Sequence, residues 1–268
     1  MDGTKKIRLG LIGKDVSKSL SEKMHTFILN AWGIECEYQR FSVVKADFDT
    51  AMCTLLGDFD GFNVTIPYKK EVFEYLEDID DEASACGSVN TVIVGGRKGY
   101  NTDGDGFLWM LQTAGVAVEN QNVLVLGAGG SGRSSAMALK NAGANVYLYR
   151  RNKAELLEAC ERLGVTPAED IERGGYDILV NCTGVGMHDT EGKSPVTAKA
   201  FQGAKWAVDL IYVPEESEFL RLAKTQGLST LNGASMLFYQ AYVADCLYTG
   251  KTPNIEEAKR LYNAYLEI

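Results

Sequence analysis

The sequence predicts an α/β protein of two domains, each built on a mainly parallel β-sheet. Its 268 residues suit two domains, since roughly 150 residues per domain is usual. Short apolar segments alternate with segments of helical periodicity along the chain. Glycine is abundant, with 28 residues, and proline is scarce, with 5. This composition is typical of α/β folds with many tight turns between strands and helices.

The first part of the chain opens with an apolar strand followed by an amphipathic helix, and the alternation then continues. The predicted strands are Ile7–Ile12, Tyr38–Val43, Gly61–Ile66 and Val89–Val94. The predicted helices are Ser21–Trp32, Ala46–Leu56 and Glu71–Leu76. The acidic stretch Glu77–Glu82 is expected as a solvated polar face, and a glycine-rich hairpin is expected between Thr91 and Asn101.

A second alternating pattern, typical of a doubly wound sheet, follows a helix at Thr102–Leu111. Its predicted strands are Val123–Leu126, Val146–Tyr149, Ile178–Asn181, Trp206–Leu210 and a short one near Thr230. Its predicted helices are Ser134–Asn141, Ala154–Leu163 and Glu218–Thr225. Two terminal helices, Ser235–Tyr248 and Ile255–Leu266, outlast the pattern, and Asn254 with Glu257 resembles a capping box. We therefore predict one domain of residues 1–103, completed by residues 236–268, and a second of residues 104–235.

Charge and composition exclude several kinds of partner and site. With 27 basic and 36 acidic residues, the net charge of −9 argues against nucleic-acid or membrane binding. The six cysteines form no Cys-x-x-Cys pair and are expected to be buried, and two histidines are too few for a histidine-rich metal site. No apolar run of membrane-spanning length and no signal segment occurs, so we expect a cytoplasmic protein without a metal ion.

A glycine-rich turn, Gly127-Ala128-Gly129-Gly130-Ser131-Gly132, joins an apolar strand to a helix. In this Gly-x-Gly-x-x-Gly spacing the first glycine permits the tight turn, the second lets the backbone approach a pyrophosphate, and the third lets helix and strand pack closely. Free N–H groups at the helix N-terminus then bind the phosphates. Glycine turns also join strands to helices without a ligand, but strand, spacing and helix together favour a Rossmann-like cofactor domain.

The end of the next predicted strand indicates which dinucleotide is bound. NAD-binding domains usually carry an acid there, about 20 residues beyond the glycine turn. Here the strand runs into Arg150, Arg151, Asn152 and Lys153, and no carboxylate is present. Guanidinium groups match a 2′-phosphate, whereas merely solvated cations would oppose the dipole of the helix they open. The sequence therefore favours NADP(H) over NAD(H).

Polar residues also follow the predicted strands of the first domain, where parallel sheets bind ligands. Ser19 and Ser21 follow the first strand, residues 63–69 end the third, and residues 88–91 and 101–103 flank the hairpin. Each has a structural alternative, because a serine before a helix is commonly an N-cap and asparagine and aspartate are common in turns.

In these segments the chain resembles the shikimate dehydrogenase family, over essentially its whole length and in the family's order. The first-domain motifs are Ser19-Leu20-Ser21, Asn63-Val64-Thr65-Ile66-Pro67-Tyr68-Lys69, Val89-Asn90-Thr91 and Asn101-Thr102-Asp103. The later motifs are the glycine turn, Arg151, and residues 181–187, 209–214 and 236–240. The resemblance implies an NADP-dependent oxidoreductase of the chorismate pathway for aromatic amino acid biosynthesis. The implied reaction is the reversible reduction of 3-dehydroshikimate to shikimate.

The resemblance also implies roles for single residues. Lys69 and Asp103 are expected beside the reacting oxygen as the catalytic pair, with Ser19 and Ser21 binding the substrate carboxylate. The residues expected to position the ring hydroxyl groups are Thr65, Asn90, Tyr212 and Gln240. The cofactor residues expected beyond the glycine turn are Arg150, Arg151, Thr183, Gly233 and Met236. Residues 1–103 with 236–268 would thus bind the substrate and residues 104–235 would bind NADP.

Some positions depart from the family pattern. Lys18 and Glu22 stand where the family often has histidine and proline, and Thr26 replaces an asparagine after His25. His25 is expected to be a structural hydrogen-bonding residue and His188 to face solvent. Three alternatives stay open: a quinate/shikimate dehydrogenase able to use NAD, an aminoshikimate enzyme, and an NADP sensor without activity. The expected assembly is a monomer or a homodimer.

Overall fold

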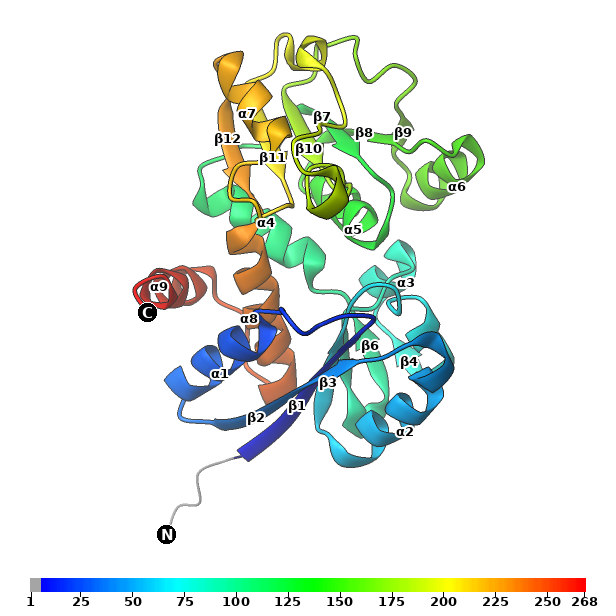
Figure 1. Cartoon of the computed structure of the whole chain (residues 1–268), viewed down its shortest axis with the longest axis vertical. Helices are drawn as coiled ribbons and strands as arrows, with labels where there is room; N and C mark the ends of the chain where they lie inside the picture. The colour runs from blue at the N-terminus through cyan, green and yellow to red at the C-terminus, as the bar shows by residue number, and fades with distance from the viewer. Residues whose placement is uncertain (1–5) are drawn as a thin grey trace. The chain divides into compact units, whose positions relative to one another are not determined.

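A computed structural model describes residues 6–268 and divides them into two compact units (Figure 1). Unit 1 contains the residues up to Thr102 together with Phe238–Ile268, and unit 2 contains Asp103–Leu237. Within the described residues each unit has one six-stranded sheet. The predicted fold class, α/β with the C-terminal helices returning to the first domain, is confirmed. The assignment of substrate and cofactor to the two domains stays a prediction.

The sheet of unit 1 is mixed, with the strand order β2-β1-β3-β5-β6-β4. Its strands are β1 Lys6–Gly13, β2 Glu35–Ser42, β3 Gly61–Val64, β4 Asp78–Ile79, β5 Thr91–Ile93 and β6 Lys98–Tyr100. β1 pairs in parallel with β2 and β3, whereas β5 is antiparallel to both β3 and β6. The antiparallel part arises because β5 and β6 form the hairpin that the glycine-rich segment predicts.

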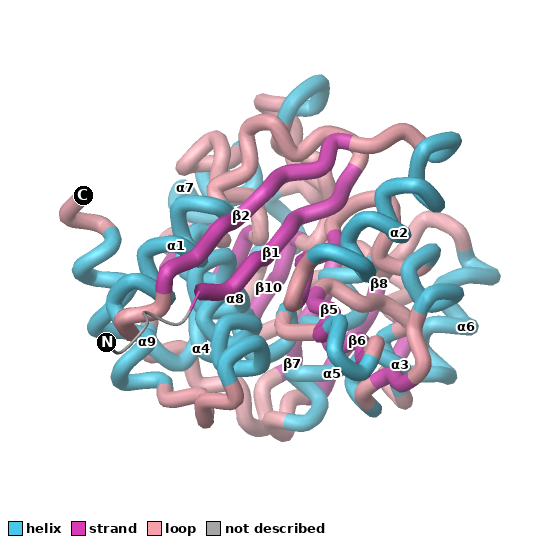
Figure 2. Tube along the Cα trace, turned by 90° about the horizontal axis from the view of Figure 1, so that it is seen from below, coloured by secondary structure: helices cyan, strands magenta, loops and turns pink. Residues whose placement is uncertain are grey.

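The helices α1 Ser21–Ala31 and α2 Phe48–Asp58 lie on opposite sides of this sheet (Figures 1 and 2). The alternation of side chains along β1 explains the arrangement. Leu9 shares a buried cluster with Leu29 of α1, whereas Ile12 shares another with Met52 of α2. The remaining helices of unit 1 are α3 Asp81–Cys86, α9 Ile255–Tyr265 and most of α8 Ala234–Thr249. Its 3₁₀ helices are Lys45–Asp47, Glu71–Tyr75 and Val94–Gly96.

Unit 2 contains a parallel sheet with the strand order β12-β11-β10-β7-β8-β9. The strands are β7 Asn122–Leu126, β8 Asn145–Tyr149, β9 Thr166–Pro167, β10 Ile178–Asn181, β11 Trp206–Asp209 and β12 Ser229–Asn232. The helices are α4 Asp103–Thr113, α5 Gly130–Asn141, α6 Lys153–Leu163 and α7 Glu218–Thr225, with 3₁₀ turns at His188–Thr190 and Ala198–Phe201. The chain builds outward from β7 to β9 and then resumes at β10 on the other side of β7. This confirms the doubly wound prediction and places the topological switch point between β7 and β10.

Several local details differ from the sequence-based expectations. The acidic stretch Glu77–Glu82 has no buried residue, as expected, but it also contains β4 and the start of α3. β4 is held by backbone pairing with β6 rather than by an apolar pattern. Glu71–Tyr75 is a 3₁₀ helix, and β9 was not predicted at all. Cys53 is exposed, contrary to the expectation of burial for all six cysteines. Asn254 does cap α9, but the carboxylate of Glu257 accepts hydrogen bonds from Trp32 and Tyr242.

Candidate active site

Ser19 and Ser21 lie at the start of α1 in unit 1. The Ser19 hydroxyl donates to Ser21 Oγ at 3.0 Å, and the Ser21 backbone N–H donates to Ser19 Oγ at 3.2 Å. The N-cap of α1 is Leu20, and no side chain caps the helix. The alternative explanation of Ser21 as an N-cap is therefore wrong. Its hydroxyl faces that of Ser19, an arrangement suited to holding a carboxylate.

A chain of buried neutral side chains continues from Ser21. The Tyr38 hydroxyl donates to Asn63 Oδ1 at 3.0 Å. Burial raises the pKa of Tyr38 well above its usual value, and a hydrogen bond from Ser21 acts in the opposite direction. Asn63 Nδ2 donates to Thr91 Oγ1 at 3.2 Å, and the Thr91 hydroxyl donates to Asn90 Oδ1 at 2.9 Å. Every polar group in this chain has a partner, as burial requires.

The series of hydrogen bonds continues through Asn90, which is only 3% exposed. The Thr102 backbone N–H donates to Asn90 Oδ1 at 2.9 Å, and Asn90 Nδ2 donates to Thr102 Oγ1 at 3.0 Å. Asn90 Nδ2 also donates to Gln240 Oε1 at 3.4 Å, which brings α8 into the network. Four of the predicted substrate residues, Ser19, Ser21, Asn90 and Gln240, thus belong to one hydrogen-bonded system.

Thr65 and Lys69 follow β3 on the segment that borders this system. The Thr65 backbone N–H donates to the Ile12 carbonyl at 2.9 Å, which fixes the segment to β1. The Val89 backbone N–H donates to the Lys69 carbonyl at 2.9 Å, directly before Asn90 in the chain. Both side chains are half-buried. Backbone hydrogen bonds therefore hold Lys69 next to the segment that contains Asn90.

In unit 2 the glycine turn connects β7 to α5 at the switch point. Gly127 has a φ of +107°, which side chains rarely permit, and a Cβ on it would lie 2.9 Å from the carbonyl oxygen of Cys182. A Cβ on Gly132 would lie 1.9 Å from the Gly127 carbonyl oxygen, so the turn and α5 pack too closely for any side chain. A Cβ on Gly129 would meet no atom within 4 Å. The turn thus leaves open space above exposed backbone, which fits a pyrophosphate.

The predicted catalytic Asp103 is the first residue of α4 and is 6% exposed. The hydroxyl of Ser131, in the glycine turn, donates to Asp103 Oδ2 at 3.3 Å. The structure thus joins a predicted catalytic carboxylate directly to the predicted cofactor turn. Sequence spacing did not indicate this contact, because it depends on the packing of α4 against α5.

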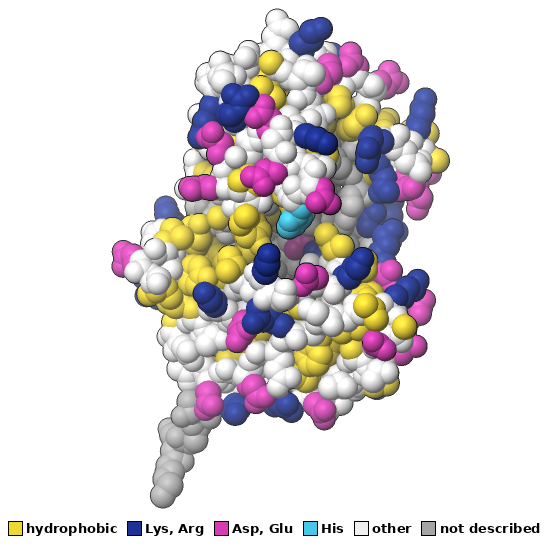
Figure 3. Space-filling model, viewed as in Figure 1, with side chains coloured by type: hydrophobic (Ala, Val, Ile, Leu, Met, Phe, Trp, Pro, Cys, Tyr) yellow, Lys and Arg dark blue, Asp and Glu magenta, His cyan; other side chains and the backbone are white. Residues whose placement is uncertain are grey.

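Basic side chains gather on the side of unit 2 that carries α5 and α6 (Figure 3). Arg133 and Arg150 both donate to the Ala128 carbonyl, at 3.3 and 3.2 Å. Arg133 was not predicted as a site residue, although it directly follows the glycine turn. The expectation that no carboxylate lies at the end of β8 was wrong. Glu155, in the first turn of α6, forms an ion pair with Arg150 there. Arg151 is exposed.

The loops carrying Thr183 and Tyr212 rest on a buried polar network at the ends of β10 and β11. Asn181 Nδ2 donates to Asp209 Oδ1 at 3.1 Å, and the Thr183 hydroxyl donates to Asn181 Oδ1 at 2.6 Å. The Ser217 hydroxyl donates to Asp209 Oδ2 at 2.5 Å. Burial raises the pKa of the Asp209 carboxyl, although these hydrogen bonds oppose the shift. Burial also raises the pKa of Tyr212.

The two remaining predicted cofactor residues also lie in unit 2. A Cβ on Gly233 would lie 2.2 Å from the Leu210 carbonyl oxygen, so the chain needs glycine there for packing alone. Met236 is buried in the first turn of α8. The structure gives both positions a packing role, and their contact with a cofactor stays a prediction.

His25 and Asp245 form a buried pair in unit 1 that sequence analysis only half anticipated. His25 Nδ1 lies 2.6 Å from Asp245 Oδ1, and neither residue is exposed to solvent. The His25 ring stacks on Tyr38 with 4.9 Å between ring centroids. A structural hydrogen-bonding role for His25 is therefore confirmed, whereas no sequence signal indicated Asp245, which lies 220 residues away. His188 is exposed, as expected.

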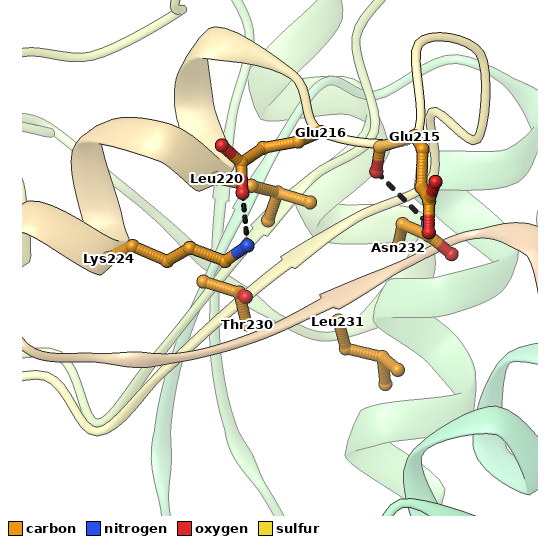
Figure 4. A pocket seen from close by; sticks show the side chains of 7 residues that line it. All are labelled: Glu215, Glu216, Leu220, Lys224, Thr230, Leu231 and Asn232. Atoms are coloured by element: carbon orange, nitrogen blue, oxygen red, sulfur yellow. Dashed lines mark hydrogen bonds and ion pairs between the residues drawn. The ribbon is translucent and has the colours of Figure 1, made fainter.

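Unit 2 also has an open hollow of about 580 Å³ (Figure 4). There Lys224 forms an ion pair with Glu216, and Asn232 donates to the Glu215 carbonyl at 3.0 Å. None of its lining residues belongs to the predicted site.

Across residues 6–268, no group of three or more His, Cys, Asp or Glu side chains is placed to hold a metal ion. None of the helices in that range combines the length and apolar character needed to cross a membrane.

Comparisons with known proteins agree with this description. Residues 11–92 match the family described as the shikimate dehydrogenase substrate binding domain. The shikimate dehydrogenase (NADP(+)) of Thermus thermophilus is 37% identical over 259 residues, which span 95% of this chain and 98% of that relative. The crystal structure of a Thermus thermophilus shikimate 5-dehydrogenase in complex with NADP(H) and shikimate has a TM-score of 0.87 at 34% identity. It covers 97% of this chain and 99% of its own.

A quinate dehydrogenase from Corynebacterium glutamicum in complex with NAD is also similar, with a TM-score of 0.82 at 28% identity over 97% of this chain and 99% of its own. The doubly wound sheet, its glycine turn and the separate mixed sheet define a two-domain protein of the dinucleotide-binding class. The resemblance found in the sequence is confirmed at the level of the family. The chain belongs to the shikimate dehydrogenase family.

Proposed function

We propose that the protein catalyses the reversible, NADPH-dependent reduction of 3-dehydroshikimate to shikimate. The observation that carries the proposal is the series of hydrogen bonds between neutral side chains that runs from Ser19 to Gln240, with buried residues between these two half-buried ends. A substrate with several hydroxyl groups and one carboxylate suits this chain. Hydroxyl and amide side chains select such substrates stringently, because an analogue that lacks a hydroxyl leaves a buried partner unpaired.

When bound, NADPH supplies the hydride that the substrate carbonyl carbon accepts. The carbonyl oxygen then gains negative charge and needs a proton. The Lys69 ammonium stabilises this charge and donates a proton, and the Asp103 carboxylate orients the ammonium or exchanges the proton with it. The roles of Lys69 and Asp103 within this pair are part of the proposal.

The other residues bind and orient. Ser19 and Ser21 hold the substrate carboxylate with hydroxyl donors, and four residues position the ring hydroxyls: Thr65, Asn90, Tyr212 and Gln240. The glycine turn and the N-terminus of α5 hold the pyrophosphate, and Ser131 of that turn donates a hydrogen bond to Asp103. Arg151 attracts the 2′-phosphate. Thr183, Gly233 and Met236 complete the cofactor site.

An assay of NADPH oxidation with purified protein tests the proposal. We expect NADPH absorbance to fall only when 3-dehydroshikimate is present, with one NADPH oxidised per shikimate formed. Binding of NADPH without turnover would support a cofactor sensor instead. The similarity to an NAD-bound quinate dehydrogenase favours one other candidate, a quinate/shikimate dehydrogenase. Faster turnover of quinate than of shikimate would identify that activity.

Two further expectations belong to this proposal. The protein acts in the cytoplasm, where NADPH and the pathway intermediates are available. It acts as a monomer or a homodimer, which sedimentation of the purified protein distinguishes.

A further inference from the structure

We propose that Glu155 is a specificity-determining residue for the cofactor, and that Arg150 acts on cofactor choice by cancelling its charge. This inference rests on the proposed NADP-dependent activity and concerns the adenosine end of the same site. The two side chains are called the Arg150–Glu155 pair below.

The pair lies between the glycine turn and α6. Arg150 directly follows β8, and Glu155 lies in the first turn of α6. Arg150 Nη2 forms a close ion pair with Glu155 Oε2. Arg150 Nη1 donates to the Ala128 carbonyl at 3.2 Å. Both ends of the guanidinium are therefore occupied by groups of the protein itself.

Glu155 is also held from its other side. Asn152 Nδ2 donates to Glu155 Oε1 at 2.7 Å, and Asn152 Oδ1 caps α6 by accepting from the backbone N–H groups of Ala154 and Glu155, at 3.1 and 3.3 Å. The carboxylate is thus fixed close to the end of β8. In NAD-binding domains an acid in this region accepts hydrogen bonds from the ribose hydroxyls.

The charges around the pair give Arg150 and Arg151 different roles. Arg151 is exposed, and no hydrogen bond or ion pair joins its side chain to another residue in the described range 6–268. Arg151 therefore supplies the positive charge for a 2′-phosphate, whereas the charge of Arg150 is cancelled by Glu155. If Arg150 were removed, the bare carboxylate would repel a 2′-phosphate and offer an acceptor to a 2′-hydroxyl.

The experiment measures dissociation constants for NADPH and NADH by cofactor fluorescence, without substrate. The proteins are the parent, Arg150→Ala, Glu155→Gln and the double variant. Glutamine keeps the oxygen that Asn152 contacts and suits the third position of a helix, so only the charge is lost. Lys153→Ala is the matched control, because it removes one exposed cation from the same turn. Thermal unfolding without cofactor verifies that each variant folds.

We expect Arg150→Ala to raise the dissociation constant for NADPH about 10-fold, because the Glu155 carboxylate is then no longer neutralised. The effect is limited to this size because both side chains are partly exposed and solvent screens their charges. The dissociation constant for NADH should change by less than about 2-fold. Adding Glu155→Gln should return the NADPH value to within about 3-fold of the parent, because the repelling charge is gone. Lys153→Ala should change both values by less than about 3-fold.

Equal weakening of both cofactors by Arg150→Ala, unrelieved by Glu155→Gln, would overturn the inference and leave Arg150 as a support for the Ala128 carbonyl. An NADPH loss from Lys153→Ala as large as that from Arg150→Ala would also overturn it, since any nearby cation would then suffice. A parent protein that binds neither cofactor would instead refute the proposed function on which the inference rests.

Discussion

The substrate residues proposed in unit 1 and the cofactor residues proposed in unit 2 differ in their chemistry. Unit 1 offers buried, neutral groups, with Asn90 joined to a serine pair through four intervening hydrogen bonds. Unit 2 offers a bare backbone turn flanked by partly exposed charges, among them Arg151 and the Arg150–Glu155 pair. A buried neutral group discriminates by what a wrong ligand leaves unpaired, whereas an exposed cation attracts a phosphate through a field that salt screens. Substrate choice should therefore be strict and insensitive to salt, and cofactor choice graded and sensitive to salt.

The largest effect should come from Lys69, the cation proposed to act on the substrate in unit 1. Lys69→Ala should lower turnover about 100- to 10,000-fold, because the developing oxyanion loses its proton donor. The dissociation constant for NADPH should change by less than about 2-fold, since Lys69 lies in unit 1. Steady-state kinetics and cofactor fluorescence measure the two quantities.

The neighbouring Lys70 provides the matched control. Lys70 is exposed, and Lys70→Ala should keep nearly full turnover. Asp103→Asn should be impaired like Lys69→Ala, and the double variant should lose less than the product of the single losses if the pair acts as a unit. Turnover of Lys69→Ala within a few-fold of the parent would remove Lys69 from the mechanism.

A second variant tests the neutral side of the comparison. Ser21→Ala should raise the Michaelis constant for shikimate about 10-fold through loss of one donor to the carboxylate, and leave that for NADP+ unchanged. The melting temperature should fall modestly, because Ser21 does not cap α1 but its hydroxyl is hydrogen-bonded to Ser19 and Tyr38. A lower melting temperature with an unchanged Michaelis constant would make Ser21 a purely structural residue.

The charged side of the comparison depends on Arg151. Arg151→Ala should raise the Michaelis constant for NADPH by about 10-fold, because an exposed guanidinium loses a phosphate contact, and leave that for NADH unchanged. In the parent, added KCl should raise the Michaelis constant for NADPH more than that for 3-dehydroshikimate. Equal sensitivity of both constants to KCl would erase the proposed difference between the two regions.

The smallest effect concerns stability and the buried acid of unit 1. Burial raises the pKa of Asp245 from 3.8 to about 6, although His25 lowers it. Between these values the folded protein holds a proton that the unfolded chain has released, so the contribution of Asp245 to the unfolding free energy decreases as the pH rises. Asp245→Asn removes this titration and keeps an oxygen for His25. Its stability relative to the parent should therefore increase as the pH rises from about 4.5 to about 7.

Asp177 in unit 2 is the control of opposite sign. The Asn122 backbone N–H and then Lys205 hold its pKa below the ordinary value. Asp177→Asn should therefore become more stable relative to the parent as the pH falls, because the parent then loses a stabilising carboxylate. Urea unfolding at about pH 4.5 and 7 measures the Asp245 difference, and urea unfolding at about pH 3 and 5, on either side of the ordinary value of 3.8, measures the Asp177 difference. A relative stability of Asp245→Asn that falls as the pH rises would contradict the assignment.

Long apolar elements and short turns could be predicted from the sequence because their cause is local. Helix α7 has the bounds that its periodicity predicts, and β7 follows from a run of apolar residues. The two-residue strands β4 and β9 could not be predicted, since backbone pairing with a neighbouring strand defines them. β2 begins three residues before the prediction for the same reason, because its polar start at Glu35 pairs with β1.

The site shows the same division. Motif residues such as Ser21 and Arg151 could be proposed from local spacing. Contacts between distant residues could not be predicted. Asp245 contacts His25 from a helix 220 residues further along the chain, and Glu155 pairs with Arg150 from the first turn of α6. The prediction that no carboxylate lies at that strand end was wrong, because Glu155 approaches it from the first turn of α6.

The most direct test of the whole account is a two-by-two comparison of kcat/KM for the purified protein. Shikimate and quinate are each oxidised with NADP+ and with NAD+. Quinate carries one hydroxyl group more than shikimate, and the neutral network would have to accommodate it. NAD+ lacks the 2′-phosphate that Arg151 is proposed to attract. We predict the highest kcat/KM for shikimate with NADP+, a large loss with quinate at any salt concentration, and a loss with NAD+ that shrinks as KCl is added. Equal values for NAD+ and NADP+, or a higher value for quinate than for shikimate, would contradict the account.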